Sequence, residues 1–94
     1  MPAKLFCFEV TVETDKATGD ILAVYFRVRR GKSVKVVEMA DGNAFADYNS
    51  RGQLLGIELL GPCEVKVLDR MTRKEPKEVR DFVRGAALRE MVPA

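Results

Sequence analysis

The feature that most constrains the fold is a turn followed by an apolar run near the middle of the chain. Residues 49–52, Asn-Ser-Arg-Gly, favour a tight turn, and Gly52 can supply the positive φ that a short hairpin loop needs. Residues 54–60 then read Leu-Leu-Gly-Ile-Glu-Leu-Leu. Because Gly56 interrupts this run and Gly-Pro follows it, the run is predicted to be a strand rather than a helix.

Successive side chains of a strand point to opposite faces of its sheet. Alternation therefore predicts that Leu55, Ile57 and Leu59 share one face of this strand. The residues expected on the other face are Leu54, Gly56, Glu58 and Leu60. A strand that is apolar on both faces belongs at the centre of a sheet, and Glu58 is the one charged residue in it.

Two earlier segments alternate between apolar and polar residues, as half-buried strands do. In residues 5–14 the apolar face is Phe6, Phe8, Val10 and Val12. In residues 21–29 the face expected to point inward is Leu22, Val24, Phe26 and Val28, and the outward face is Ala23, Tyr25, Arg27 and Arg29. The short polar turn between the two segments predicts an antiparallel hairpin.

Residues 33–39 and 44–49 complete a set of five predicted strands. Turn-forming residues at 30–32 and 40–43 bound them, including an Asp-Gly pair. Short turns between all five segments predict an up-and-down antiparallel meander.

The character of the chain changes after Gly61-Pro62. Residues 63–71 fit both a strand and a short helix, and we expect a brief extended piece that turns into one or two helical turns. From Pro76 onward, apolar residues recur at helical spacing at Val79, Phe82, Val83 and Ala86. The predicted fold class is α+β: a meander of about five strands with a C-terminal helix packed on one face. The chain is expected to form a single domain, residues 1–94, with the sheet at about 5–61 and the helical segment at about 64–90.

Composition gives little support to several function classes. The net charge of +2 is too small to indicate nucleic-acid binding by itself, and the chain has no histidine, the commonest general base and metal ligand. The two cysteines, Cys7 and Cys63, are expected to be buried thiols. No apolar run is long enough to span a membrane, and the first residues lack the apolar core of a signal peptide, so we expect a cytoplasmic protein.

Three stretches resemble a known family. They are Asp-Ile-Leu-Ala-Val-Tyr-Phe at 20–26, residues 34–38, and Asp-Tyr-Asn-Ser-Arg-Gly-Gln-Leu-Leu-Gly-Ile-Glu-Leu-Leu at 47–60. Together they resemble the YuzE-like family of small, mostly prokaryotic domains of unknown function, over roughly residues 12–61. Ala23 stands where an aromatic residue is common in the family, and the tail from Cys63 is extra. The resemblance implies a compact β-rich domain with helical decoration and no established activity.

Two acidic residues form the first candidate site. Glu58 lies inside the most apolar strand, and Asp47 lies on the strand before it, so their carboxylates could hold a metal ion or a small ligand. The alternative is that Glu58 is exposed or is paired with an arginine. The spacing matches no known cation loop, so no cofactor or metal is assigned.

A second candidate site is basic. Between residues 21 and 37 there are five cations and no acid, and Tyr25 is expected on the outward face with the first two cations. The possible nucleic-acid contacts are Tyr25, Arg27, Arg29, Arg30, Lys32 and Lys35, on what would be a basic hairpin at 27–35. The alternative is a solvated edge, since Lys and Arg on edge strands block aggregation.

No catalytic constellation is present in the sequence, so the function it favours is a non-enzymatic protein-interaction module. Such a module would be a homodimer or one partner of a small hetero-complex. A nucleic-acid-binding accessory protein is the first alternative, and a metal or small-ligand protein built on Asp47 and Glu58 is the second.

Overall fold

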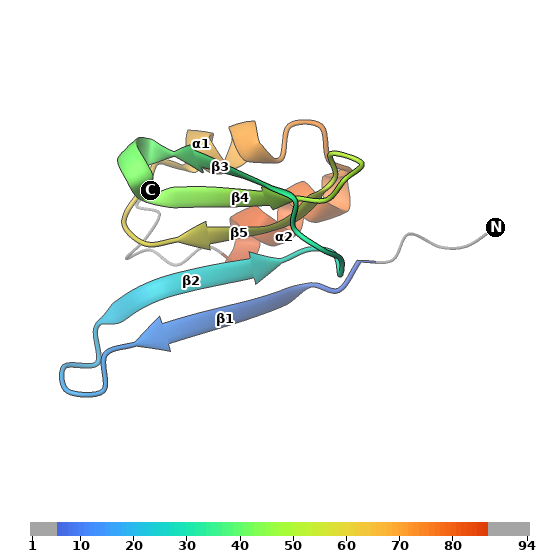
Figure 1. Ribbon diagram of the computed structural model, residues 1–94. Helices are drawn as coiled ribbons and strands as arrows, with labels where there is room; N and C mark the ends of the chain where they lie inside the picture. The colour runs from blue at the N-terminus through green and yellow to red at the C-terminus, as the bar shows by residue number, and fades with distance from the viewer. Residues whose placement is uncertain (1–5, 87–94) are drawn as a thin grey trace.

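A computed structural model of the chain describes residues 6–86 (Figure 1). It contains five strands, a short 3₁₀ turn and two α-helices. The strands are β1 (Glu9–Thr14), β2 (Ile21–Arg27), β3 (Lys35–Met39), β4 (Ala44–Tyr48) and β5 (Leu54–Leu59); the 3₁₀ turn η1 (Ala40–Gly42) precedes β4, and the helices are α1 (Val65–Met71) and α2 (Lys77–Ala86). The predicted α+β class and the five predicted strands are therefore confirmed.

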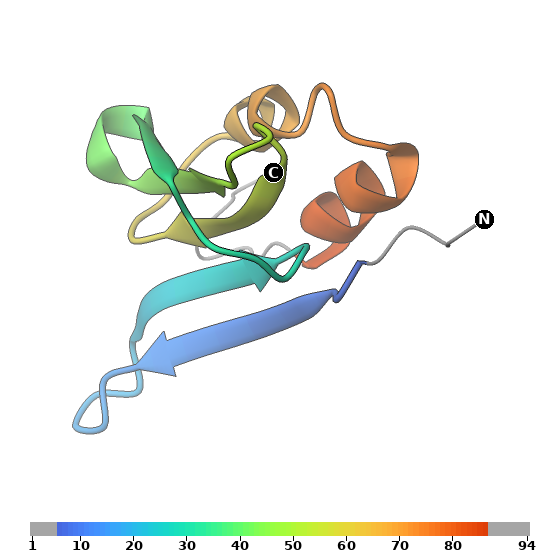
Figure 2. The same cartoon turned by 45° about the vertical axis from the view of Figure 1, so that its right-hand side comes forward.

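The strand order corrects the predicted meander. All pairings are antiparallel, but the order across the sheet is β1-β2-β5-β4-β3. Strands β3, β4 and β5 follow one another through short turns, and β2 lies beside β5, which is Greek-key connectivity. Residues 28–34 therefore form a crossover from β2 to the far edge of the sheet and not a hairpin turn (Figures 1 and 2). The seven-residue connection is long enough to pass β5 and β4. Its polar, turn-forming residues fit a hairpin as well as a crossover, so they did not show which strand β2 is followed by in the sheet.

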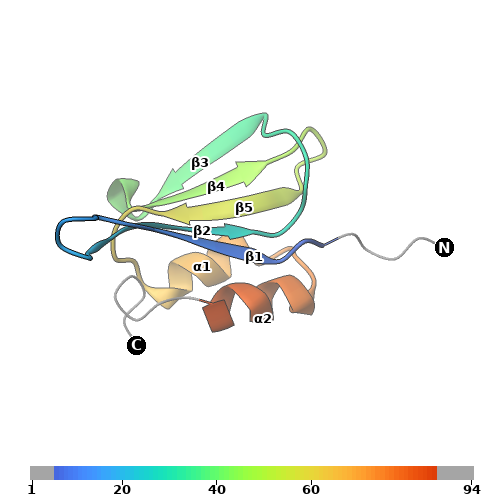
Figure 3. The ribbon, with the colours of Figure 1, turned by 90° about the horizontal axis from the view of Figure 1, so that it is seen from below.

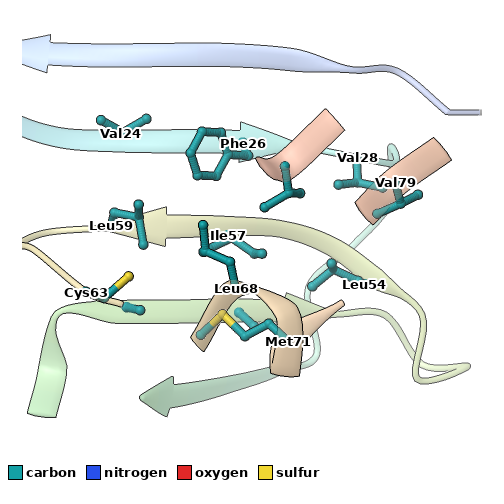
Figure 4. Packing of buried hydrophobic residues seen from close by; sticks show 13 residues of the cluster. Val24, Phe26, Val28, Leu54, Ile57, Leu59, Cys63, Leu68, Met71 and Val79 are labelled. Atoms are coloured by element: carbon teal, nitrogen blue, oxygen red, sulfur yellow. The ribbon is translucent and has the colours of Figure 1, made fainter. Parts of the chain in front are cut away.

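Both helices lie on one face of the sheet (Figure 3). The helix predicted to begin at Pro76 is confirmed as α2, and residues 63–71, which fitted two structures, form α1 after a short extended piece. Residues 87–90 of the predicted helical segment and residue 5 of the predicted sheet lie outside the described residues. Figure 4 shows the core between sheet and helices, formed by Val24, Phe26, Val28, Leu54, Ile57, Leu59, Cys63, Leu68, Met71 and Val79 together with Ala44, Ala46 and Val83.

The central position of β5 is confirmed, but the assignment of its first two residues to faces is wrong. The register between β4 and β5 shifts after Asp47, so that Tyr48 is opposite Leu54 instead of Leu55. Such a bulge breaks the two-residue alternation. Leu54 therefore joins the core with Ile57, whereas Leu55 is buried against Gly31 of the crossover.

The turn that leads into β5 is built by Asn49. Its side-chain oxygen accepts hydrogen bonds from the backbone N–H groups of Arg51 and Gln53, each at 2.9 Å. Gly52 takes a φ of +76° in this turn, as the sequence predicts. The local sequence is thus sufficient to favour the β4–β5 turn.

Strand β1 departs from the predicted half-buried character. Its pairing with β2 confirms the predicted hairpin, but all six of its residues are exposed. Val10 and Val12 are on the helix side of the sheet, opposite the core residues Phe26 and Val24, yet they are 42% and 43% exposed. The reason is position: β1 is the edge of the sheet, and the β1–β2 hairpin projects away from the helices (Figures 1 and 2).

Candidate functional site

Four of the eight candidate site residues meet on the sheet face opposite the helices. Tyr25 and Arg27 lie on β2, Glu58 on β5 and Asp47 on β4. Their neighbours along each strand, such as Phe26 and Ile57, point into the core, so alternation directs these four to the other side. Cross-strand register places Glu58 opposite Tyr25, and Gly56 opposite both Arg27 and Asp47. We call this set the open-face cluster: Tyr25, Arg27, Asp47 and Glu58.

Gly56 allows the Tyr25 side chain to reach Asp47. The Tyr25 ring extends across β5, over Gly56, and its hydroxyl donates a 3.3 Å hydrogen bond to Asp47 Oδ2 on β4. A Cβ atom at position 56 would collide with the Tyr25 phenol and would lie 2.8 Å from the Phe26 carbonyl oxygen. A side chain would therefore force Tyr25 off the sheet.

Burial and the nearby Asp47 carboxylate raise the pKa of the Tyr25 hydroxyl above its ordinary value, and Arg27 partly offsets this. The Arg27 guanidinium lies 5.4 Å from the centre of the Tyr25 ring, within cation–π range. Arg27 also approaches Glu9 of β1 at 3.8 Å. At neutral pH the tyrosine thus remains a neutral donor that already has an acceptor inside the protein.

Asp47 and Glu58 lie on the same face, as a carboxylate site requires, but on different strands and in adjacent rows. Within residues 6–86, no group of three or more His, Cys, Asp or Glu side chains is close enough to hold a metal ion. Two carboxylates, one of them hydrogen-bonded to Tyr25, are a small ligand set for a hard cation. Ca²⁺, for example, takes six or more oxygen ligands.

The basic candidates do not form one surface. Arg27 belongs to the open-face cluster, Arg30 and Lys32 are exposed on the crossover, and Lys35 begins β3 at the far edge of the sheet. Arg29, predicted to point outward beside Arg27, instead turns toward the helices. The crossover disperses these residues because it carries the chain across the sheet instead of turning it back as a hairpin.

Arg29 forms a largely buried ion pair that sequence reasoning missed. Its Nη2 lies 2.8 Å from Glu75 Oε1, and the two side chains are only 15% and 11% exposed. Arg29 Nη1 donates a 2.8 Å hydrogen bond to the carbonyl oxygen of Leu54, and the guanidinium lies 5.1 Å from the Phe6 ring centre. This pair ties the α1–α2 loop to the start of β5. The only signal in the sequence was Glu75, a single acid in a basic stretch. No fixed spacing relates Glu75 to Arg29, so the pair could not be predicted.

A groove was also missed. It lies between β3, the β4–β5 turn and the end of α1 with the loop that follows, and its volume is about 540 Å³. Four cations line it, Lys35, Arg70, Arg73 and Lys74, and its apolar lining includes Val34, Val37 and Met71. The sequence signal was the basic stretch at 70–74, which looks like an ordinary solvated helix end.

The core position of Cys63 makes its thiol a poor nucleophile. Cys63 is buried in the core, and burial raises the pKa of its thiol, which keeps it protonated and weakly nucleophilic. Neither described helix is long and apolar enough to cross a membrane.

Comparison of the chain with protein-family models, curated proteins and solved structures finds no significant match. The YuzE-like resemblance therefore stays a prediction from the motif at residues 47–60.

Proposed function

We propose that this protein is a non-enzymatic interaction module that forms a homodimer through the outer edge of β1. The observation that carries the proposal is the exposure of β1. Phe8, Val10 and Val12 are 40–43% exposed although they lie on the face that elsewhere forms the core. Phe8 also stacks on the Phe82 ring of α2, with 4.6 Å between the ring centres. Val10 and Val12 lie on an edge strand whose outer side no other described strand covers, and such apolar side chains favour association with another strand.

The backbone of the edge supports the same proposal. The Cys7 N–H donates to the Val28 carbonyl oxygen at 2.9 Å, so it points toward β2. Backbone groups of successive strand residues point to opposite edges. Those of Phe8, Val10 and Val12 therefore point outward, where they are available to a new antiparallel neighbour. The residues that carry the exposed apolar side chains are thus also the ones with free hydrogen-bonding groups.

Charge selects the register of such a pair. If two copies of β1 pair around Val10, Val10 meets Val10 of the second copy, Phe8 meets Val12, and Glu9 meets Thr11. If they pair around Thr11, Glu9 meets Glu13, which like-charge repulsion disfavours. We therefore favour the Val10-centred register. Pairing along one strand buries less than a standard interface, so we expect a dissociation constant of about micromolar or weaker.

The test is sedimentation velocity over a range of concentrations at low and at high salt. Wild type should shift from monomer to dimer, and Val10→Lys should stay monomeric because it places a charge on the apolar edge. Val36→Lys is the matched control, since Val36 is 56% exposed on β3, the opposite edge. A strictly monomeric wild type, or dissociation by Val36→Lys and not by Val10→Lys, would show that the proposal is wrong.

We propose a cytoplasmic location for this module. Both cysteines are free thiols, which fits a cytoplasmic setting, where disulfides are rare. Nucleic-acid binding on 27–35 receives no support from the dispersed arginines and lysines. Ligand binding at Asp47 and Glu58 also receives no support, because the Asp47 carboxylate already accepts a hydrogen bond from the Tyr25 hydroxyl.

A further inference from the structure

The groove between β3 and α1 has an unbalanced charge. Four cations line it, and its one acidic lining residue, Glu75, is already paired with Arg29. None of the ion pairs found within residues 6–86 involves Lys35, Arg70, Arg73 or Lys74. Arg73 also lines a second hollow, together with Asp69 and Asp81. Cations that outnumber the carboxylates on a concave surface create a positive potential that attracts anions.

The end of α1 opposes this potential only in part. The carbonyl end of a helix carries at most about half a negative charge, and α1 is short. Arg70 lies in its last turn and offsets that charge directly. The net field in the groove therefore remains positive.

The lining also has an apolar part and a hydrogen-bond donor. Val34, Val37 and Met71 provide apolar contact, and the half-buried Tyr48 ring lies with them. Burial and the Glu75 carboxylate raise the pKa of the Tyr48 hydroxyl, so it keeps its proton at neutral pH. A bound molecule would thus meet cations on one side and an aromatic and aliphatic surface on another.

We infer that this groove binds a small organic phosphate with an aromatic part, of the mononucleotide class. A volume of about 540 Å³ is within the usual range for small-molecule sites and exceeds what a lone phosphate would fill. Arginine and lysine suit a phosphate group, and the apolar lining suits a planar base. The inference goes beyond the proposed dimer, because β3 and β1 are opposite edges of the sheet.

The test is an NMR titration of the full chain with AMP, adenosine and inorganic phosphate. AMP should shift the backbone amides of Ser50, Gly52 and Lys74 around the groove. Adenosine, which lacks the phosphate, should bind at least about tenfold more weakly, as expected from losing a charge-assisted contact. Inorganic phosphate should shift the same amides at higher concentration.

Single substitutions assign the site. Arg73→Gln and Lys74→Gln should each weaken AMP binding about tenfold. Lys66→Gln is the matched control: Lys66 is an exposed cation on α1 that does not line the groove, so its loss should leave the affinity unchanged. If Lys74→Gln perturbs folding, Lys35→Gln makes the same test from the opposite wall. Val10→Lys should bind AMP as wild type does, so failure of the dimer and failure of this site remain distinguishable.

Several results would overturn the inference. They are equal binding of adenosine and AMP, no binding of AMP, amide shifts that map away from the groove, or equal losses from Lys66→Gln and Lys74→Gln. Tighter binding of a single-stranded RNA oligonucleotide, with shifts spread over the crossover cations, would also overturn it and would favour nucleic-acid binding.

Discussion

Replacing Arg29 with methionine should destabilise the fold strongly. Methionine keeps much of the side-chain volume but removes the ion pair to Glu75 and the hydrogen bond to the Leu54 carbonyl, both at 2.8 Å. Removing one partner of a buried ion pair costs about 3–5 kcal/mol, and an unsatisfied buried carbonyl costs about 1–3 kcal/mol.

These two costs overlap, and they are reduced because Glu75 keeps 11% of its side-chain exposure and can recruit water. We therefore expect a loss of about 3–4 kcal/mol in the free energy of unfolding. For a chain of this size, that loss corresponds to a fall in Tm of roughly 12–30 °C. Glu75→Gln keeps one acceptor for Arg29 but leaves the guanidinium charge unpaired, so it should be destabilising but less so than Arg29→Met.

Urea unfolding followed by circular dichroism measures these losses. Arg84→Met is the matched control, because its pair with Asp69 at 3.0 Å is about half exposed and should contribute less than about 1 kcal/mol. The double variant Arg29→Met, Glu75→Leu should be more stable than Arg29→Met alone, since it leaves no unpaired charge. If Arg29→Met were no more destabilising than Arg84→Met, the reasoning would be refuted.

Two further predictions concern the open-face cluster. Gly56→Ala should lower the free energy of unfolding by about 1–3 kcal/mol, because the added methyl displaces the Tyr25 ring; wild-type stability in urea would contradict this. In a Tyr48→Phe background, the phenolate absorbance of Tyr25 should appear above the ordinary pKa of 10.0. Asp47→Asn should lower this pKa and Arg27→Ala should raise it; shifts in the opposite directions would contradict the causes given.

The same tyrosine sets an alkaline limit on stability. Its folded pKa is raised, so below pH 10.0 both the folded and the unfolded chains hold the proton and the stability is fully present. As the pH rises through the folded pKa, the unfolded chain has already ionised and stability is lost. Tyr48 acts in the same direction, because its pKa is raised as well.

Local patterns were enough to predict the elements of the fold. Alternation in β2, the Asn49-to-Gly52 turn and the helical spacing of Val79 and Val83 each depend on neighbours in sequence. They could be read without knowing the rest of the chain. The structure confirms the turn, the helix and the alternation from Val24 to Val28, but Leu22, predicted to point inward, is exposed, and Ala23, predicted to point outward, is buried.

Features that depend on long-range contacts could not be predicted. The crossover at 28–34 has the composition of a hairpin turn, so the sheet order was missed. The bulge that separates Leu54 from Leu55 requires the β4–β5 register. Arg29 has the same residue type as its exposed neighbour Arg30, and only the position of Glu75 in the tertiary structure distinguishes them.

In the candidate site, too, local patterns could be predicted and long-range contacts could not. Alternation was sufficient to place Tyr25 with Arg27 on one face, and Asp47 and Glu58 join them in the structure. The hydrogen bond from Tyr25 to Asp47 over Gly56 could be predicted only with the knowledge that β5 separates β2 from β4. The cationic groove depends on the approach of the α1–α2 loop to β3, which no sequence spacing records.

Hydrogen exchange of the β1 backbone amides at low and high protein concentration tests the central claim most directly. If two copies pair through β1, the amides of Val10 and Val12 should exchange more slowly at high concentration, while those of Val36 and Glu38 on β3 should not change. Concentration-independent exchange along β1, or protection that appears on β3 instead, would contradict the account.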